Sequence, residues 1–333
     1  MNKKALALLS GGLDSTLAIR VMQEQGIEVE ALNFMTPFCN CTNKGKGCKS
    51  EAKRVADVLN VPIKILNKGK DYLDVVRNPR FGYGKNLNPC VDCRIFMHKI
   101  AKEYMREIGA SFIVTGEVLG QRPMSQRRDT LNIIDRESGL KGLVLRPLSA
   151  QLFDPTIPEQ EGLVDRDKLL KISGRSRKPQ MQLADDYDLK GYQCPAGGCL
   201  LTDAAFARRL KDIFDHSDDI NMLDVYLLKT GRHFRLDDDT KLIVSRKEAE
   251  GEKLSHYKTE RYTLLTPHNA PGPTGLIIGN GSDGNIATTL RIMARYFKKE
   301  LDNIEIKVTH LHDESILPVG ESFNEDTVNA MII

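Results

Sequence analysis

The 333-residue sequence lacks any long apolar run, and this absence excludes a membrane-spanning helix. Such a helix needs about 20 consecutive apolar residues. The short apolar run after Lys4 ends in a Gly-rich turn, without the longer stretch and the cleavage site of a signal peptide. We therefore expect a cytoplasmic protein that has no membrane partner.

The sequence also has little net charge, because 48 Lys and Arg residues face 45 Asp and Glu residues, for a formal value of +3. Composition alone therefore does not indicate a nucleic-acid binder. Basic residues do cluster at Arg122, Arg127 and Arg128, and again at 175–178. These clusters are either phosphate contacts or solvated loops. The hydrophobic share of 41% and the charged share of 28% are those of a globular protein.

Internal repeats and low-complexity tracts are missing too, so the fold is predicted from local periodicity. Apolar runs of strand length alternate with helical patterns as far as residue 115. This alternation predicts an α/β fold, in which helices cover both faces of a parallel sheet. The strands are expected at 4–9, 28–34, 62–66 and 111–115, and the helices at 14–25, 50–59 and 92–108.

Beyond residue 120 the pattern weakens, with the end of a further strand at 146–148 and a short helix at 165–172. Short strands take over after residue 202. We therefore expect a catalytic domain at 1–202 and a smaller C-terminal α+β domain at 203–333. Its strands are predicted at 232–236, 241–245, 262–266, 274–278 and 304–310, and its helices at 203–214, 247–256 and 287–298.

A Gly-rich turn, Ser10-Gly11-Gly12-Leu13-Asp14-Ser15, joins the first strand to the first helix. Consecutive glycines let backbone N–H groups approach an anion, and the helix N-terminus adds partial positive charge. Asp14 either caps the helix or holds Mg²⁺. The turn lacks the Gly-Lys-Ser/Thr of a Walker A loop and the spacing of a Rossmann fingerprint. It resembles the signature of the PP-loop ATP pyrophosphatases, which implies cleavage of ATP to AMP and pyrophosphate.

A second segment, 114–121, is followed by Ser125 and Gln126. It resembles the Thr-Gly-Glu-Ser-Leu-Gly-Gln…Ser-Gln segment of the tRNA 4-thiouridine synthetases, and 143–148 resembles their next core strand. Val118 replaces the expected Ser, and Arg122-Pro123-Met124 is a further departure. The tRNA 2-thiouridylases, with Gly-His in place of Gly-Glu, are less similar. The resemblance implies a tRNA substrate, ATP and Mg²⁺.

Several residues near these two motifs are expected to contact the nucleotide. Asn33 and Phe34, at the end of the second predicted strand, are placed to meet the adenine. Gly116 lets the backbone approach the nucleotide. Contacts to ATP or to the displaced base are expected from Gln121, Ser125 and Gln126.

Seven cysteines lie in loop-like settings, and a reducing compartment should keep them from forming structural disulfides. Cys90 and Cys93, with the distant Cys199, resemble the arrangement in archaeal-type thiolation enzymes. That resemblance implies a [4Fe-4S] cluster on three cysteines, for which Cys194 is the alternative third ligand. Soft thiolates suit such clusters.

Two other uses of these cysteines stay open. Cys93 and Cys199 could carry a persulfide and resolve it through a transient disulfide. A structural zinc ion is the other choice, although it needs four ligands. The group Cys39, Cys41 and Cys48 follows the second strand, as a second metal site or an added sulfur relay.

Recognition of RNA is expected to involve the C-terminal domain. The chain starts directly at the ATP-binding domain and resembles a minimal 4-thiouridine synthetase without the N-terminal RNA-binding module. Residues 231–236 and 241–250 resemble the small RNA-binding domain of ribosome-quality-control proteins, or are simply two strands and an amphipathic helix. His98, His310 and His312 share no metal-ligand spacing with the cysteines and are expected to be structural or solvated.

These observations favour an ATP-dependent tRNA sulfurtransferase of the 4-thiouridine type, supplied by sulfide or a persulfide carrier. The enzymatic alternatives are a tRNA 2-thiouridylase that uses a cysteine persulfide and a PP-loop ligase that adenylates a small molecule. A nucleotide-binding redox or RNA-binding protein without turnover is the non-enzymatic alternative. The sequence leaves open whether the chain forms a homodimer.

Overall fold

The computed structural model describes residues 2–39, 48–189, 198–257, 260–298 and 303–333, the side chains of 48–50 excepted. The chain divides into two compact units, Met1–Asp203 and Ala204–Ile333. Within the described ranges, no helix combines the length and the apolar character needed to cross a membrane.

The first unit is built on a five-stranded parallel sheet in the order β3-β2-β1-β4-β5. The expected parallel α/β fold is thereby confirmed. Its strands are β1 (Lys4–Leu8), β2 (Glu28–Met35), β3 (Ile63–Asn67), β4 (Phe112–Thr115) and β5 (Val144–Leu145).

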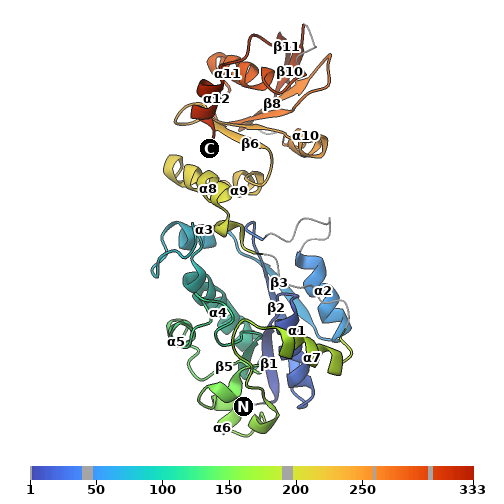
Figure 1. The fold of residues 1–333 in the computed structure, drawn as a ribbon, viewed down its shortest axis with the longest axis vertical. Helices are drawn as coiled ribbons and strands as arrows, with labels where there is room; N and C mark the ends of the chain where they lie inside the picture. Colours follow the sequence, from blue (N-terminus) through green and yellow to red (C-terminus); the bar gives the residue numbers. More distant parts are fainter. Residues whose placement is uncertain (1, 40–47, 190–197, 258–259, 299–302) are drawn as a thin grey trace. The chain divides into compact units, whose positions relative to one another are not determined.

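Alternate residues of the short strands face opposite sides of this sheet, as the period of two in a strand requires. Ala5 and Ala7 pack with α1 (Leu13–Gln23), α2 (Cys48–Val58) and α7 (Lys178–Asp186). Leu6, between them, packs instead with α4 (Cys90–Glu107). Figure 1 shows α4 on one side of the sheet and α1, α2 and α7 on the other.

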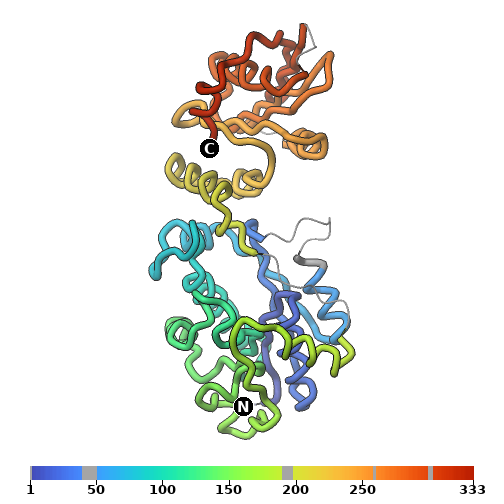
Figure 2. The backbone as a smooth tube through the Cα atoms, viewed as in Figure 1, coloured from blue at the N-terminus to red at the C-terminus, as the bar shows by residue number. Residues whose placement is uncertain are grey.

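The order of the strands places a crevice beside β1. The chain runs outward from β1 to β2 and β3, and then returns to β4 on the other side of β1 (Figure 2). The loops that leave β1 and β4 therefore turn toward opposite faces. In open α/β sheets, ligands bind at such a switch point, beyond the carboxyl ends of the strands.

Four helices of this unit, α3 (Lys70–Arg77), α5 (Arg128–Glu137), α6 (Ile157–Gln160) and α7, lie where no helix was predicted. The helix predicted at 165–172 is wrong, since only a 3₁₀ turn, Arg166–Lys168, forms there. The amides of Leu170 and Ile172 donate instead to the carbonyls of Pro147 and Leu148, at 2.9 and 2.8 Å. These bonds hold the segment extended along the chain that follows β5.

The second unit contains a six-stranded antiparallel sheet in the order β11-β10-β8-β9-β7-β6. Its helix α11 (Asp283–Ala294) begins four residues before the predicted start, because the Ser282 hydroxyl accepts a bond from the Asn285 amide. The strands are β6 (Arg232–Arg235), β7 (Lys241–Val244), β8 (Tyr262–Pro267), β9 (Gly275–Ile278), β10 (Glu305–His310) and β11 (Asp313–Pro318). The other helices are α8 (Ala204–His216), α9 (Met222–Leu227), α10 (Glu248–Ser255) and α12 (Glu325–Met331).

Candidate active site

The turn after β1 is held in shape by its own hydroxyl groups. Ser15 Oγ donates to the Gly12 carbonyl at 2.9 Å and lies 3.1 Å from Ser10 Oγ. Gly11 has a φ of +79°, which favours glycine. Helix α1 starts at Leu13 without a side-chain cap from any described residue. Its first backbone amides are therefore available to an anion, and the helix dipole favours negative charge there.

Gly116 follows β4 and lies against the start of α1. A Cβ atom at this position would lie 2.4 Å from the Ser15 nitrogen and 2.6 Å from the Asp14 oxygen. Both are backbone atoms, which cannot move without moving the helix. Glycine at 116 thus lets the loop after β4 pass directly against the Gly-rich turn at 10–15, the predicted phosphate-binding turn.

Asp14 is a partly buried carboxylate at the N-terminal end of α1. Burial raises the pKa of Asp14, although a hydrogen bond from Gln121 and the charge of Arg177 oppose the shift. Gln121 Nε2 donates to Oδ2 at 3.1 Å, and Arg177 lies 4.0 Å from the same oxygen. The other oxygen, Oδ1, has no hydrogen-bond partner among the described residues. A buried carboxylate oxygen in this state fits the hard-oxygen coordination of Mg²⁺.

One cavity of about 460 Å³ joins the phosphate-binding turn to the cysteines. Gly11 and Gln121 are not part of its lining, while Asn33 is fixed at its wall by a 2.7 Å hydrogen bond from Nδ2 to the Leu9 carbonyl. The structure therefore brings together residues from segments that are far apart in the sequence. The predicted site residues that line the cavity are Ser10, Gly12, Asp14, Ser15, Asn33, Phe34, Gly116, Ser125, Gln126, Cys39, Cys90, Cys93 and Cys199.

The three free thiols of the described chain lie on this cavity and differ in acidity. Burial raises the pKa of the Cys90 thiol and raises that of Cys199 to about 11. Burial acts in the same direction on Cys93, but the charge of Lys68 and a hydrogen bond from Tyr72 outweigh it and lower the pKa of Cys93. Lys68 Nζ lies 3.0 Å from Cys93 Sγ. Cys93 is thus the thiol most easily converted to a thiolate.

A single metal ion is not favoured by the residues that the structure describes. Among them, no three His, Cys, Asp or Glu side chains are close enough to hold one ion. This speaks against a structural zinc site on Cys90, Cys93 and Cys199. An iron–sulfur cubane contacts each thiolate through a different iron atom, so its ligands need not converge on one point. Three cysteine thiols that line one cavity are ligands of the type that such a cluster requires.

The remaining cysteines contribute less to this picture. Cys41 and Cys194 lie outside the described residues, as does the side chain of Cys48. Cys39 forms a β-bridge with Cys199, so its segment is part of the cavity wall. Cys39 is disulfide-bonded, and the expectation that disulfides are absent is therefore wrong for this residue.

Sequence reasoning missed a buried ionic network beneath the cavity. Glu117 Oε2 accepts from Arg146 Nε at 3.0 Å, and Oε1 lies 3.5 Å from Arg94 Nη1. Burial raises the pKa of Glu117, but the two guanidinium groups outweigh it and lower the value to about 2. Asp135 also pairs with Arg146, at 2.8 Å. The signals available were Glu117, which lies inside the segment 114–121, and Arg94, which directly follows Cys93.

The predicted basic cluster is divided by the fold. Arg122 lines the cavity, and burial lowers its pKa. Arg127 instead pairs with Asp129 at 3.3 Å, and Arg128 donates to the Leu152 carbonyl at 2.6 Å. His98 is fully buried, with Nδ1 2.8 Å from the Arg94 carbonyl, and lies outside the cavity lining.

Two protein-family models match separate parts of the chain. Residues 1–151 match the family described as "Thiamine biosynthesis protein (ThiI)". Residues 231–330 match the "NFACT protein RNA binding domain". The second match begins one residue before β6 and covers the antiparallel sheet of the C-terminal unit.

The similar curated proteins are tRNA-specific 2-thiouridylases. The MnmA of Caldicellulosiruptor saccharolyticus is 24% identical over 202 residues, which cover 57% of this chain and 56% of that protein. MnmA 2 of Clostridium botulinum is 31% identical over 127 residues, or 35% of each chain. The matched segments thus span only about a third to a half of these relatives.

Similar solved structures include a 4-thiouridine synthetase–RNA complex with bound ATP, at 22% identity and a TM-score of 0.37, covering 68% of this chain and 51% of that one. The U34-tRNA thiolase NcsA from Methanococcus maripaludis with its [4Fe-4S] cluster gives 19% identity and a TM-score of 0.33, covering 68% of both chains. Such low TM-scores carry no argument about function. The family models and the thiouridylase relatives support a resemblance to PP-loop proteins of the tRNA thiolation branch over residues 1–151, and to the NFACT RNA-binding domain over residues 231–330.

Proposed function

We propose that this protein is an ATP-dependent tRNA sulfurtransferase that replaces a uridine carbonyl oxygen with sulfur. One observation carries the proposal: the uncapped start of α1, the carboxylate of Asp14 and three free thiols line a single cavity. An ATP-cleaving ligase for small molecules needs the first two of these features but has no use for the thiols.

The reaction requires two successive displacements. The uridine oxygen attacks the α-phosphate of ATP. The bond between the α-phosphorus and the bridging oxygen breaks, and pyrophosphate leaves. The oxygen, now part of a good leaving group, departs with AMP when sulfur attacks the ring carbon. The cavity would hold the two reacting centres close together, which removes much of the entropic cost of each step.

Individual residues are assigned roles by their positions. The amides at the start of α1 would bind pyrophosphate, and Asp14 would hold Mg²⁺ through its unpartnered oxygen. Asn33 and Phe34 would border the adenine, because both lie on the cavity wall at the end of β2. Phosphate charge would be met by Arg122 and Arg177, and base contacts would come from Ser125 and Gln126.

For delivery of sulfur we propose a [4Fe-4S] cluster held by Cys90, Cys93 and Cys199, with Cys194 as the alternative third ligand. Such a cluster, when bound, would present sulfur to the activated carbon. Lys68 would favour the thiolate form of Cys93, since its ammonium group lies 3.0 Å from the sulfur. The same ion pair would also assist a persulfide on Cys93, which is the competing route.

The 4-thiouridine product is favoured by residues 114–121, which resemble a segment of the tRNA 4-thiouridine synthetases and lie inside the part of the chain that the ThiI model matches. The similarity to 2-thiouridylases favours instead the carbonyl at position 2 of the uracil ring. For residues 203–333 we propose a role in holding the tRNA, because most of that segment matches an RNA-binding domain. Residues 1–202 would then form the catalytic domain.

The test is sulfur transfer by purified protein under anaerobic conditions, with tRNA, ATP, Mg²⁺ and sulfide. Mass spectrometry of the digested tRNA should show a thiolated nucleoside, and its retention time separates 4-thiouridine from 2-thiouridine. Release of pyrophosphate that depends on tRNA distinguishes an enzyme from a protein that only binds nucleotides. Absence of both products would contradict the proposal.

A second measurement decides how sulfur is carried. The protein isolated without oxygen should be brown, and its visible absorption should be lost when Cys90, Cys93 or Cys199 is replaced by Ala. Thr36→Ala is the matched control, because Thr36 borders the same cavity but is not among the proposed cluster ligands. A colourless wild-type protein that transfers sulfur from a persulfide donor would favour the persulfide route.

A further inference from the structure

The C-terminal unit contains a separate cavity of about 240 Å³, which has no part in the chemistry proposed above. It lies between the helices α8 and α9 and the strands β6, β7 and β9. Pockets for drug-sized ligands measure roughly 300 to 1,000 Å³, so this cavity suits a smaller ligand such as one planar ring system. Its apolar wall is formed by the buried side chains Ile213, Ile220, Leu228, Ile243 and Ile278.

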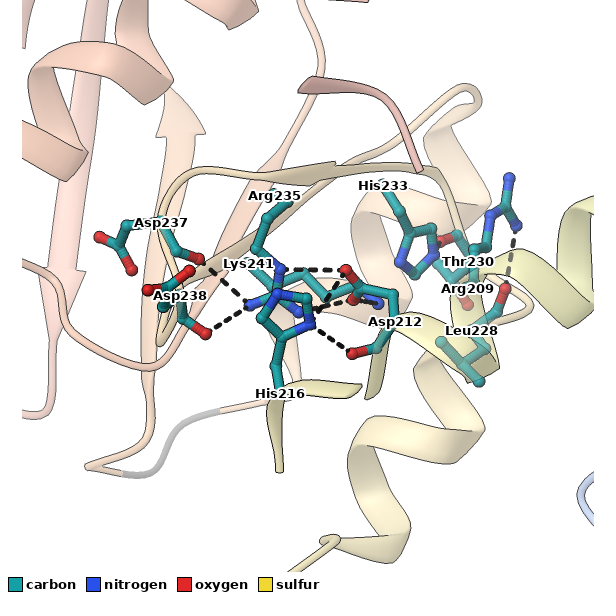
Figure 3. Close-up of polar contacts among 10 residues, drawn as sticks. All are labelled: Arg209, Asp212, His216, Leu228, Thr230, His233, Arg235, Asp237, Asp238 and Lys241. Carbon is teal, nitrogen blue, oxygen red and sulfur yellow. Dashed lines mark hydrogen bonds and ion pairs between the residues drawn. The ribbon is translucent and has the colours of Figure 1, made fainter. Parts of the chain in front are cut away.

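Two cations at this cavity share one carboxylate. Arg235 forms a fork with Asp212, at 3.0 Å from Nε and 2.6 Å from Nη2, and Lys241 Nζ lies 3.1 Å from the same group. Figure 3 shows Arg235, Lys241 and His216 around Asp212. Burial lowers the pKa of Lys241 to about 8, against the opposing charge of Asp212. Arg235 and Lys241 together carry more positive charge than the single carboxylate of Asp212 neutralises. The cavity is therefore bordered by hydrogen-bond donors with a net positive charge.

His233 adds an acceptor to the same wall. Its Nε2 lies 2.9 Å from the Thr230 carbonyl, which can only accept, so Nε2 carries the proton. Burial and the charge of Lys241 lower the pKa of His233 well below its usual value, so the ring is neutral. Its Nδ1 then presents a lone pair, and no described residue donates to it, although the side chain is only 1% exposed. A buried acceptor left unpaired is costly unless a ligand satisfies it.

The rim carries negative charge. Asp238 and Asp239 are exposed carboxylates at the cavity, whereas Asp224 is already bonded to Arg261 at 2.9 Å and to Tyr262 at 2.8 Å. Carboxylates at the rim oppose a phosphate group, which offers mostly acceptors. They suit a ligand whose edge presents N–H donors next to carbonyl acceptors.

A nucleobase has this combination of apolar faces and an edge with both donors and acceptors. We propose that the cavity binds an unpaired nucleobase of RNA, with its carbonyl groups toward Arg235 and Lys241 and an N–H toward His233. The inference rests on the proposed function, because tRNA would supply that base. It also agrees with the position of His233, Arg235 and Lys241 inside the NFACT-type RNA-binding domain.

The test uses the full chain and RNA heptamers in which six positions are abasic and the central one carries A, C, G or U. A fully abasic heptamer has the same phosphates and serves as the reference. We expect about tenfold tighter binding of at least one heptamer than of the reference, measured by fluorescence anisotropy at constant salt.

Two variants locate the preference. Lys241→Met removes a cavity donor and should abolish it, and Ile213→Phe fills the cavity without a change of charge and should do the same. Lys307→Met is the matched control, since Lys307 lies on β10, outside the cavity lining, and pairs at the surface with Glu314. Equal binding of all five heptamers by the wild-type chain would overturn the inference, even if neither variant folds. A preference that survives both substitutions would also overturn it.

The outcome is separable from that of the proposed function when thiolation of tRNA is measured with the same preparations. A base preference without sulfur transfer contradicts only the enzymatic proposal. Sulfur transfer by a chain without a base preference contradicts only the inference about the C-terminal cavity.

Discussion

Replacement of Gly116 by Ala tests whether the active site depends on the contact between two backbone segments. The added Cβ would lie 2.4 Å from the Ser15 nitrogen and 2.5 Å from the Asp14 carbonyl carbon. Ordinary contacts between such atoms are about 1 Å longer, so either the loop after β4 or the start of α1 must move by that amount. Overpacking of this kind costs about 1–3 kcal/mol of stability.

The effect on catalysis should be larger than the effect on folding. A displacement of 1 Å at an orienting element can slow a reaction by about 100-fold, and here the displaced element is the phosphate-binding turn itself. We therefore expect pyrophosphate release in the presence of tRNA to fall by about 100-fold in Gly116→Ala. The melting temperature should fall by only a few degrees.

The matched control is Gly69→Ala, in the same unit. Gly69 precedes α3 with an ordinary φ of −81°, and an added Cβ would meet no described atom within 4 Å. This variant should keep wild-type turnover. If Gly116→Ala retained turnover within a factor of two of Gly69→Ala, the close approach of the two segments would not matter for catalysis.

Three further predictions concern charges in the first unit. Glu117→Gln should lower the free energy of unfolding at pH 7 by about 3 kcal/mol, because it removes the buried negative charge that faces Arg94 and Arg146, although Arg146 keeps its pairing with Asp135. In urea titrations this difference should be full above pH 4.5 and vanish as the pH falls toward 2, since folding lowers the pKa of Glu117 to about 2. In the cluster-free protein, Lys68→Met should raise the pKa of Cys93 and shift the ultraviolet absorbance of its thiolate to higher pH, whereas Lys64→Met, at the surface of the same sheet, should not. Asp14→Asn should raise the Mg²⁺ concentration needed for half-maximal pyrophosphate release, and an unchanged Mg²⁺ requirement would contradict the cation site.

The parallel fold and the turn between β1 and α1 could be predicted because their signals are local. The strand at Lys4–Leu8, the Gly pair and the helix after Asp14 are contiguous, and each restricts the backbone by its own residues. The strand β11 was missed for the opposite reason. Its residues are largely exposed, so they show no alternation of apolar and polar side chains, and the strand forms only by pairing with β10.

In the candidate site, too, residues in local motifs could be predicted, and residues brought together only by folding could not. Cys90, Cys93 and the Gly116 segment were found because they form motifs along the chain. Lys68 was missed, although it lies 3.0 Å from Cys93, because 25 residues separate the two in the sequence. The cavity beside His233 could not be predicted either, since its walls come from two helices and three strands that meet only in the folded unit.

The start of α1 has no side-chain cap, so a bound nucleotide would complete the hydrogen bonding of this helix. The first amides of such a helix have no side-chain acceptor, so an anion that binds there satisfies their hydrogen bonds. Bound ATP would act there as the N-terminal cap, so occupancy and local order should rise together. Amide hydrogens at 13–15 would then exchange slowly only while a phosphate is bound. The stability of the first turn of α1 would therefore depend on the ATP concentration.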